Sequence, residues 1–417
     1  MKQIVIEGKK TLTGTIEIGG SKNSAVALVP ASLLSDGIVE IDNIPEISDI
    51  DALMEILVYL GAKVEKKEKR IIIDSRNIEN KEVPEAISKK LRASYYFMGV
   101  LLGKFKKVEM YFPGGCSIGE RPINLHLKGF EALGAKVTIE GNKYKVEAEK
   151  LIGNNIYLDI ASVGATINIM LAASLAEGRT VIENAAKEPH IVNVATFLNQ
   201  MGAKITGAGT SRICIEGVEK LNGAFHEVVP DYIESGTYVI AGALCGKDLI
   251  IKNLIPLHIE SLTSKLKEMG SKLEIGKDYI KISACDNYKP ASITTAVYPG
   301  FPTDLQQTFG VLLTQCEGKS KIRETIFENR FMHIPYLQKM GANLQINGIE
   351  ETIIGKTELI GSDVEATDLR AGAAMILAGL IADGTTRIGS IEHVLRGYEN
   401  IVEKLETVGA KIRIEEI

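Results

Sequence analysis

The phrase LGAKV at residues 60–64 decides the fold, because it recurs along the whole chain. It returns unchanged at 133–137, and four variants keep its apolar first residue, its glycine and a small third residue. The copies stand about 70 residues apart, which is typical of a chain built from repeated units. The variants are MGAKI at 201–205, MGSKL at 269–273, MGANL at 340–344 and VGAKI at 408–412.

The residues before each phrase have helical spacing. Ile50, Leu53 and Leu57 form one apolar stripe with a 3.6-residue period, and the glycine of the phrase favours a left-handed cap. A second recurring phrase, such as LAEGRTVIE at 175–183, also passes from an apolar helical run through glycine to a β-rich stretch. Each unit therefore predicts two helices, each followed by a strand. Most units add a β-rich segment: RIIID at 70–74, YKVEAE at 144–149, RICIEG at 212–217 and YIKIS at 279–283.

The sixth unit lacks that last segment, and a matching stretch stands at the start of the chain. Residues 4–14, IVIEGKKTLTG, resemble residues 213–223, ICIEGVEKLNG, which close the third unit. We therefore expect the N-terminal strand to complete the C-terminal domain. With three units in each domain, the boundaries give one domain at 21–228 and a second at 1–20 and 229–417.

Composition excludes several classes of protein. The 417 residues carry a formal net charge of -5, which argues against a surface dominated by attraction to nucleic acid or acidic membranes. No signal-peptide core and no apolar run of about 18 residues is present, so a cytoplasmic protein is expected. The five cysteines and six histidines are dispersed without ligand spacing, and neither a metal nor an organic cofactor is expected. The oligomeric state stays open, and a monomer is compatible with the sequence.

Cations recur where the repeat places helix starts. Counting back from the glycines reaches the first helices of the six units at Lys22, Arg92, Gly164, Tyr232, Asp304 and Arg370. The same count for the second helices reaches Arg121, Arg330 and Arg396 in three units. A helix N-terminus already carries positive partial charge, so cations there favour an anionic ligand bearing phosphates and carboxylates. The alternative is solvated charges, or ion pairs to Asp and Glu.

Two loops add candidate chemistry. In PGGCSIGERP at 113–122, Cys116 lies near Arg121 and just before a helix in whose first turn Pro122 fits. Both neighbours favour a thiolate, so Cys116 is a candidate proton donor or nucleophile, with an inert surface thiol as the alternative. SVGAT at 162–166 combines Ser, Gly and Thr ahead of an apolar helix, which suits either phosphate binding or a simple N-cap.

These motifs together resemble the UDP-N-acetylglucosamine 1-carboxyvinyltransferase family, the enolpyruvyl transferases that open bacterial peptidoglycan synthesis. The resemblance runs from residue 2 to 415, with the motifs in the family's order. It implies an α/β fold, a two-domain inside-out α/β barrel of six βαβαββ repeats closing around its substrates. The motifs are GSKNS, LRASYY, PGGCSIGERP, SVGAT, PGFPTDLQ, FENRFMH, TDLRAG and RGYE.

The implied reaction moves the enolpyruvyl group of phosphoenolpyruvate to the 3-hydroxyl of UDP-N-acetylglucosamine and releases phosphate. By resemblance, Cys116 is the acid, can carry a phospholactoyl adduct and is the target of fosfomycin, while Asp304 is the base and Lys22 and Arg396 are further catalytic residues. The donor's phosphate and carboxylate are then held by Lys22, Arg92, Arg121, Arg370 and Arg396. Contacts to the UDP-sugar are implied for Asn23, Arg121, Ser162, Val163, Gly164, Asp304 and Ile326, and substrate binding also for Pro122, Arg330 and Asp368.

Several positions depart from the family pattern, and two rival functions remain. Asn124, Tyr232, His190 and Leu395 replace Asp, Arg, Glu and Asp of that pattern, and Ile160 and Ala161 precede SVGAT where Lys or Pro is usual. One rival is enolpyruvyl transfer to shikimate 3-phosphate, against which the PGGC loop and SVGAT argue. The other is a catalytically silent paralogue that only binds UDP-sugars.

Overall fold

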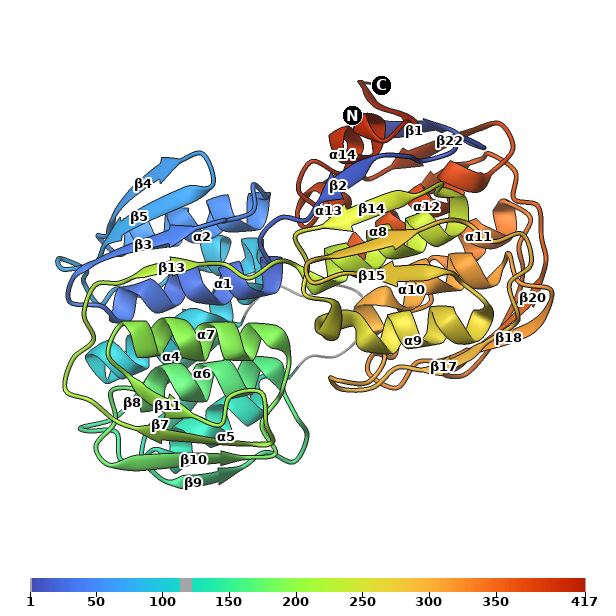
Figure 1. Ribbon diagram of the computed structural model, residues 1–417. Coiled ribbons are helices and arrows are strands. Elements are labelled where there is room, and N and C mark those ends of the chain that lie inside the picture. The colour runs from blue at the N-terminus through green and yellow to red at the C-terminus, as the bar shows by residue number, and fades with distance from the viewer. Residues whose placement is uncertain (1, 113–121, 417) are drawn as a thin grey trace. The chain divides into compact units, whose positions relative to one another are not determined.

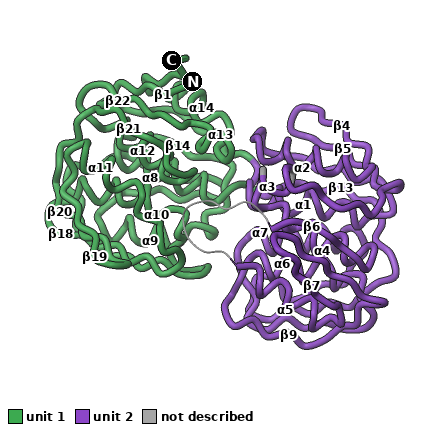
Figure 2. The backbone as a smooth tube through the Cα atoms, turned by 180° about the vertical axis from the view of Figure 1, so that it is seen from behind, with its two compact units in different colours: residues 1–19, 117–120, 230–417 green, residues 20–116, 121–229 purple. Residues whose placement is uncertain are grey.

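The computed structural model describes residues 2–112 and 122–416 (Figure 1). The predicted Cys116 and Arg121 therefore lie outside the described residues. The described chain falls into two compact units, one of residues 20–112 and 122–229 and one of residues 2–19 and 230–416 (Figure 2). Each unit has a hydrophobic core of its own, and each is described by itself below.

The unit of residues 20–229 alternates short strands with helices. Its helices are α1 (Lys22–Ala31), η1 (Ser32–Leu34), α2 (Ser48–Tyr59), α3 (Glu85–Lys90), η2 (Arg92–Tyr95), α4 (Tyr96–Phe105), α5 (Asn124–Ala132), α6 (Val163–Ala173) and α7 (Pro189–Gln200). Its strands are β3 (Ile38–Asp42), β4 (Lys63–Lys67), β5 (Arg70–Asp74), β6 (Lys107–Tyr111), β7 (Lys136–Glu140), β8 (Lys143–Glu147), β9 (Asn155–Tyr157), β10 (Arg179–Glu183), β11 (Lys204–Thr206), β12 (Arg212–Glu216) and β13 (Phe225–Glu227).

The other unit has the same alternation. Its helices are α8 (Tyr232–Cys245), η3 (Pro256–Ile259), α9 (Glu260–Met269), α10 (Thr303–Leu313), α11 (Ile334–Lys339), α12 (Leu369–Ile381), α13 (Glu392–Leu395) and α14 (Ile401–Thr407). Its strands are β1 (Lys2–Glu7), β2 (Thr15–Glu17), β14 (Leu249–Lys252), β15 (Leu273–Ile275), β16 (Tyr279–Ile282), β17 (Ser292–Thr294), β18 (Gly318–Arg323), β19 (Asn343–Asn347), β20 (Glu350–Gly355), β21 (Asp363–Glu365), β22 (Thr385–Gly389) and β23 (Lys411–Glu416).

The sheets share one order of strands. In the sheet β17-β18-β20-β19, β17 and β18 are parallel, and the two remaining pairs are antiparallel. The sheets β2-β14-β16-β15, β9-β10-β12-β11, β13-β3-β5-β4 and β21-β22-β1-β23 repeat it, while β6-β8-β7 has a single parallel bridge, Val83 to Met110, in place of the first strand. The fold is thus α/β with several mixed sheets, and none of those in the described chain closes into a barrel.

The N-terminal strand belongs to the last sheet of the chain. β1 pairs antiparallel with β22 on one side and with β23 on the other, with Ile4 opposite Ile388 and Ile414. Ile4 and Ile6 are fully buried in the core of this unit. Burial of these two side chains therefore holds the first residues of the chain against the last ones.

In each unit the helices at the centre are buried nearly along their whole length. α6 has buried residues from Gly164 to Ala173, as its continuous apolar sequence predicts. In the unit of 20–229, α4 packs against α1 and α6, and in the other unit α8, α10 and α12 pack against one another (Figure 1). A short strand that pairs in parallel precedes most of these helices, namely β2 before α1, β9 before α6, β13 before α8, β17 before α10 and β21 before α12.

Replacing Ile6 by alanine should destabilise the fold, because it removes a fully buried side chain from the strand that joins β22 and β23. We expect the free energy of unfolding, measured with urea, to fall by about 2–5 kcal/mol. Lys2→Ala, on an exposed residue of the same strand, is the matched control and should change it by less than about 0.5 kcal/mol. A loss of under about 1 kcal/mol for Ile6→Ala would contradict the burial of β1.

Candidate functional site

Asp304 is the second residue of α10, and its carboxylate joins two buried guanidinium groups. Arg330 Nη2 donates to Asp304 Oδ1 at 2.6 Å, and Arg370 Nη2 donates to Asp304 Oδ2 at 3.1 Å. The Arg330 and Arg370 side chains are only 2% and 6% exposed, whereas that of Asp304 is 26% exposed. The charge of Asp231 also acts on Arg370, and Asp368 caps its backbone, so the two guanidiniums offer an anionic ligand directed N–H donors within a cluster of carboxylates.

Asp368 and Gln307 fix the backbone around these cations by hydrogen bonds. Asp368 is the N-cap of α12, and its Oδ1 accepts from the backbone N–H of Arg370 at 2.7 Å. Gln307 Nε2 donates to Asp368 Oδ2 at 3.2 Å and to the carbonyl oxygen of Arg330 at 3.1 Å. Asp368, which the sequence places among the binding residues, thus serves here as a cap that orients Arg370.

Tyr398, in the segment between α13 and α14, packs against Arg370. The Arg370 guanidinium lies 5.2 Å from the centre of the Tyr398 ring, and the Tyr398 hydroxyl shares a 2.9 Å hydrogen bond with Thr237 Oγ1. Burial raises the pKa of the Tyr398 hydroxyl, so the ring stays neutral beside the cation. The RGYE motif therefore contributes the ring on which Arg370 rests.

Ile326 and Arg396 lie beside the same helix starts. The N–H of Ile326 donates to Glu324 Oε1 at 2.8 Å, and Glu324 Oε2 accepts from Thr303 Oγ1, next to Asp304, at 2.9 Å. Arg396 follows α13, which packs against α12. The elements that carry Asp304, Ile326, Arg330, Asp368, Arg370 and Arg396 are thus brought together within one unit.

The predicted positions at the first helices are confirmed, but two of those at the second helices are wrong. Lys22, Gly164, Tyr232, Asp304 and Arg370 lie in the first turn of α1, α6, α8, α10 and α12, and Arg92 begins η2. Arg330, however, lies four residues before α11, which begins at Ile334 beside Pro335. Arg396 caps the C-terminal end of α13, and α14 begins only after Asn400, whose φ of 49° interrupts the helix. Pro122 likewise precedes α5 by two residues and is not in its first turn.

The unit of 20–229 places Lys22 against a carboxylate. Lys22 Nζ lies 2.7 Å from Asp49 Oδ2, with side chains 12% and 7% exposed. Ser21 caps α1 by accepting from the N–H of Ser24, and Asn23 is the next residue of that helix. The ion-pair alternative raised by the sequence therefore describes Lys22, Arg330 and Arg370, each of which has a carboxylate partner.

The SVGAT turn lies directly on a buried histidine. Ser162 caps α6 by accepting from Ala165 N–H, and a Cβ added at Gly164 would stand 3.0 Å from His126 Nε2 and 3.1 Å from Tyr95 Oη. Only glycine therefore lets the backbone at Val163 and Gly164 approach this ring. His126 Nδ1 and Asn168 Nδ2 lie 2.8 Å apart, and Asn168 Oδ1 accepts from Gly99 N–H at 2.9 Å.

Arg92 acts electrostatically on the same histidine. Burial, with a smaller effect of the Arg92 charge, lowers the pKa of His126 to about 3, so the imidazole is neutral near pH 7. Pro122 precedes the helix that carries His126. Within this unit the structure thus groups the segments of Arg92, Pro122 and Ser162–Gly164 around His126.

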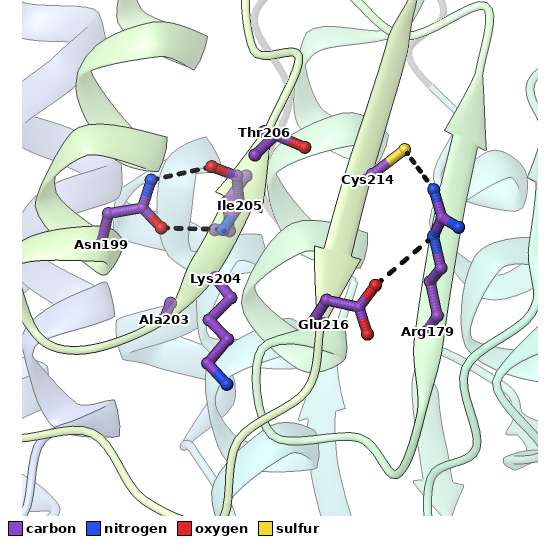
Figure 3. Close-up of a pocket in the computed structure, with 8 residues that line it drawn as sticks. All are labelled: Arg179, Asn199, Ala203, Lys204, Ile205, Thr206, Cys214 and Glu216. Carbon is purple, nitrogen blue, oxygen red and sulfur yellow. Dashed lines mark hydrogen bonds and ion pairs between the residues drawn. The ribbon is translucent and has the colours of Figure 1, made fainter.

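A pocket of about 360 Å³ lies elsewhere in this unit, at β11, β12 and β10 (Figure 3). In it, Arg179 Nη2 donates to Cys214 Sγ at 3.5 Å, and the Asn199 side chain bonds the backbone of Ile205. None of the predicted site residues lines it. The lining residues are Arg179, Asn199, Ala203, Lys204, Ile205, Thr206, Cys214 and Glu216.

Two general searches of the described residues gave negative results. No group of three or more His, Cys, Asp or Glu among residues 2–112 and 122–416 could hold a metal ion. Among the helices in the same ranges, none has the length and apolar character to cross a membrane.

Comparison with known proteins settles the family. The family described as EPSP synthase (3-phosphoshikimate 1-carboxyvinyltransferase) matches residues 6–405. UDP-N-acetylglucosamine 1-carboxyvinyltransferase 2 of Bacillus subtilis (strain 168) is 52% identical over 413 residues, 99% of this chain and 96% of that protein. The protein of the same name from Clostridium acetobutylicum is 52% identical over 418 residues, 100% of both chains. This chain belongs to the UDP-N-acetylglucosamine 1-carboxyvinyltransferase family.

Solved structures of other enolpyruvyl transferases share the fold. The enolpyruvyl transferase NikO from Streptomyces tendae superimposes with a TM-score of 0.90 at 25% identity, covering 99% of this chain and 98% of that one. An EPSP synthase from Acinetobacter baumannii gives a TM-score of 0.75 at 19% identity over 100% of both chains. The architecture of this transferase is thus common to enzymes of widely different sequence.

Sequence reasoning missed the partners of the predicted residues. Asp49, His126 and Gln307 touch or orient site residues, yet no motif marked them. Asp49 lies in the first turn of α2, where the helix dipole favours an acidic residue. That preference is common to many helices, so it did not point to Lys22. His126 left no signal, since a single histidine on an apolar stripe has no spacing to interpret.

Acid should destabilise the enzyme through its buried histidines. Burial lowers the pKa of His126 to about 3, that of His226 to about 4 and that of His333 to about 4. Each folded-state pKa is depressed, so the stability these groups contribute is full above pH 6.5 and is lost as the pH falls toward 4 and 3.

His126→Asn tests this linkage by urea unfolding at pH 7 and pH 4. The variant should lose about 3 kcal/mol less than the wild-type chain over that interval, because one depressed imidazole is gone. His393→Asn, at a half-exposed position, is the control and should behave like wild type. Equal losses in His126→Asn and wild type would show that His126 does not resist protonation in the fold.

Proposed function

We propose that this transferase moves the enolpyruvyl group of phosphoenolpyruvate to the 3-hydroxyl of UDP-N-acetylglucosamine, with release of phosphate, as the first committed step of peptidoglycan synthesis. The observation that carries the proposal is the 52% identity, over essentially the whole chain, to relatives named for that reaction. The accessible Asp304 carboxylate between two buried guanidiniums supports it, because the donor is an anion and the acceptor must lose a proton.

The reaction has two balanced stages. In the first, a proton adds to the methylene carbon of the donor while the sugar oxygen bonds to the neighbouring carbon and gives up its own proton. In the second, the methyl group returns a proton and the carbon–oxygen bond to phosphate breaks, which regenerates the double bond. We assign proton delivery to Cys116 and proton removal from the sugar hydroxyl to Asp304, with Lys22 and Arg396 stabilising charge as it develops.

The binding roles follow the charges of the site. Lys22, Arg92, Arg121, Arg370 and Arg396 are proposed to hold the phosphate and carboxylate of the donor. The buried positions of Arg370 and Lys22 support this, because guanidinium and ammonium groups in low-dielectric surroundings bind anions more strongly than they do in water. The proposed contacts to the UDP-sugar are Asn23, Arg121, Ser162, Val163, Gly164, Asp304 and Ile326, and substrate binding is also proposed for Pro122, Arg330 and Asp368.

We further propose the finer architecture and the setting of the enzyme. The proposed fold is the inside-out α/β barrel of six βαβαββ repeats, with residues 21–228 as one domain carrying Cys116, and 1–20 with 229–417 as the other, carrying Asp304. The recurrence of one parallel and two antiparallel strand pairs from sheet to sheet supports this. The proposed location is the cytoplasm, where both nucleotide sugar and phosphoenolpyruvate are small-molecule substrates.

Phosphate release separates the candidate functions. The chain should release phosphate from phosphoenolpyruvate with UDP-N-acetylglucosamine and not with shikimate 3-phosphate, the acceptor suggested by the description of the matching family. Release with shikimate 3-phosphate alone would assign the other acceptor. Binding of UDP-N-acetylglucosamine without turnover of either acceptor would indicate the silent paralogue and overturn the proposal.

Asp304→Asn tests the base directly. The amide keeps one acceptor oxygen for one of the two guanidiniums, loses the other acceptor and cannot take the hydroxyl proton, so kcat should fall by about a hundredfold or more. Because the chain has no tryptophan, substrate binding is best measured by calorimetry, and it should persist. Asp363→Asn, an exposed aspartate of the same unit, is the control. Near-normal turnover in Asp304→Asn would remove Asp304 from the base role.

A further inference from the structure

Three buried polar side chains of the unit that contains Asp304 have hydrogen-bonding atoms without a protein partner. They are Gln306 (Nε2 and Oε1), His333 (Nδ1 and Nε2) and Glu351 (Oε1 and Oε2), and within the described part of the chain the only protein contact of this kind is between the His333 ring and the backbone of Arg330. All three residues are 0% exposed. A buried polar atom without a partner is destabilising, so a stable fold must satisfy these atoms in another way.

Two of the three side chains converge on one spot of α10. A Cβ added at Gly310 would stand 3.8 Å from Glu351 Oε2, 3.9 Å from His333 Nε2 and 3.5 Å from Ile322 Cδ1. The carboxyl group of Glu351 and the ring of His333 therefore face the same small space, which a methyl group would fill. Gln306 lies one turn earlier on the same face of α10. We call this space, bounded by Gln306, Gly310, Ile322, His333 and Glu351, the Gly310 chamber.

The protonation states of the two facing groups are complementary. Burial raises the pKa of Glu351 to about 8, and its cross-strand neighbours on β18 and β19 are Ile322 and Ile346. Burial lowers the pKa of His333 to about 4, where the charge of Asp368 and a hydrogen bond to the Arg330 backbone oppose the shift and the charge of Arg330 adds to it. Between these values Glu351 carries a proton to donate, and His333 offers a free nitrogen to accept one.

Residues adjacent in sequence and two hydrogen bonds connect the Gly310 chamber to Asp304. Gln307, next to Gln306, donates to the carbonyl oxygen of Arg330, and His333 follows Arg330 by three residues in the turn before α11. Arg330 in turn bonds Asp304 Oδ1 at 2.6 Å. A shift of α10 or of the His333 turn would therefore move the guanidinium that orients the carboxylate.

We propose that the Gly310 chamber holds a bound water that joins the Glu351 carboxyl group to the His333 imidazole, and that this link positions Arg330 against Asp304. A methyl group beside Gly310 would meet no atom closer than 3.5 Å, and a water there would accept a hydrogen bond from the Glu351 carboxyl O–H and donate one to the His333 nitrogen. Glu351 and His333 are positioning residues, because neither bonds Asp304. The catalytic part of this inference rests on the proposed function, in which Asp304 is the base.

Glu351→Gln tests the link, because glutamine has the shape of the protonated carboxyl group and cannot ionise. The raised pKa of Glu351 means that its stabilising effect is full below the ordinary carboxyl pKa and is lost as the pH rises through about 8. Tm should therefore match wild type at pH 5 and exceed it by at least about 5 °C at pH 8.5. Glu350→Gln, at the exposed neighbour that pairs with Lys321, should follow wild type. Parallel Tm curves for wild type and Glu351→Gln would overturn the proposal.

Kinetics test the positioning role. With phosphate release as the readout, kcat/KM of wild type should fall above pH 8, whereas that of Glu351→Gln should not. Gly310→Ala fits without any contact below 3.5 Å and improves helix propensity, yet it fills the space for water, so kcat/KM should fall about tenfold without a rise in Tm. A higher Tm with unchanged kcat/KM would show that the chamber is only packing space. Absence of phosphate release from wild type would reject the proposed function alone, because the Tm curves still decide whether the link exists.

Discussion

The fold depends on a backbone conformation that glycine adopts readily at six places. The glycine of each repeated phrase has φ between 92° and 108°, and in every case it turns the chain out of a helix into a strand. That strand, one of β4, β7, β11, β15, β19 and β23, is always the edge strand of its sheet. In the five four-stranded sheets of the described chain the opposite edge is a short parallel strand that precedes a buried helix, and in β6-β8-β7 a single bridge from Val83 takes its place.

This arrangement explains why charged side chains gather at helix starts in a protein whose central helices are otherwise apolar. A buried helix must begin near the surface or carry groups that satisfy its first N–H donors, and Ser21, Ser162, Asp231 and Asp368 perform that task as N-caps. Lys22 and Arg370, beside two of these caps, are held almost completely buried by Asp49 and Asp304. Burying such cations costs free energy that anionic partners close by offset, and an anionic substrate is drawn to the same places.

Much of the architecture could be predicted from the sequence, because the repeat keeps a fixed distance between glycine and helix start. The first-helix positions, Lys22 and Asp304 among them, and strands such as β5 at 70–74 follow from that spacing. The predicted helix-start positions of Arg330 and Arg396 were wrong, because α11 begins only at Ile334 beside Pro335 and α14 begins only after Asn400. The contacts of Asp49 with Lys22 and of His126 with the Gly164 turn could not be predicted either. Each contact joins residues of two different elements, so no fixed interval along the sequence marks it. The unpaired Glu351 is a polar residue at a strand position where the repeat alone favours an apolar one.

The place of β1 between β22 and β23 also bears on how the protein is made. A ribosome delivers residues 20–229 as one uninterrupted stretch, and all the strands of its sheets are present once β13 has emerged. β1, in contrast, has no partners until β22 and then β23 are translated. Apolar Ile4 and Ile6 must therefore wait without their partners while most of the residues between β1 and β22 are synthesised, and the unit that contains Asp304 completes this sheet later than the unit of 20–229 completes its own.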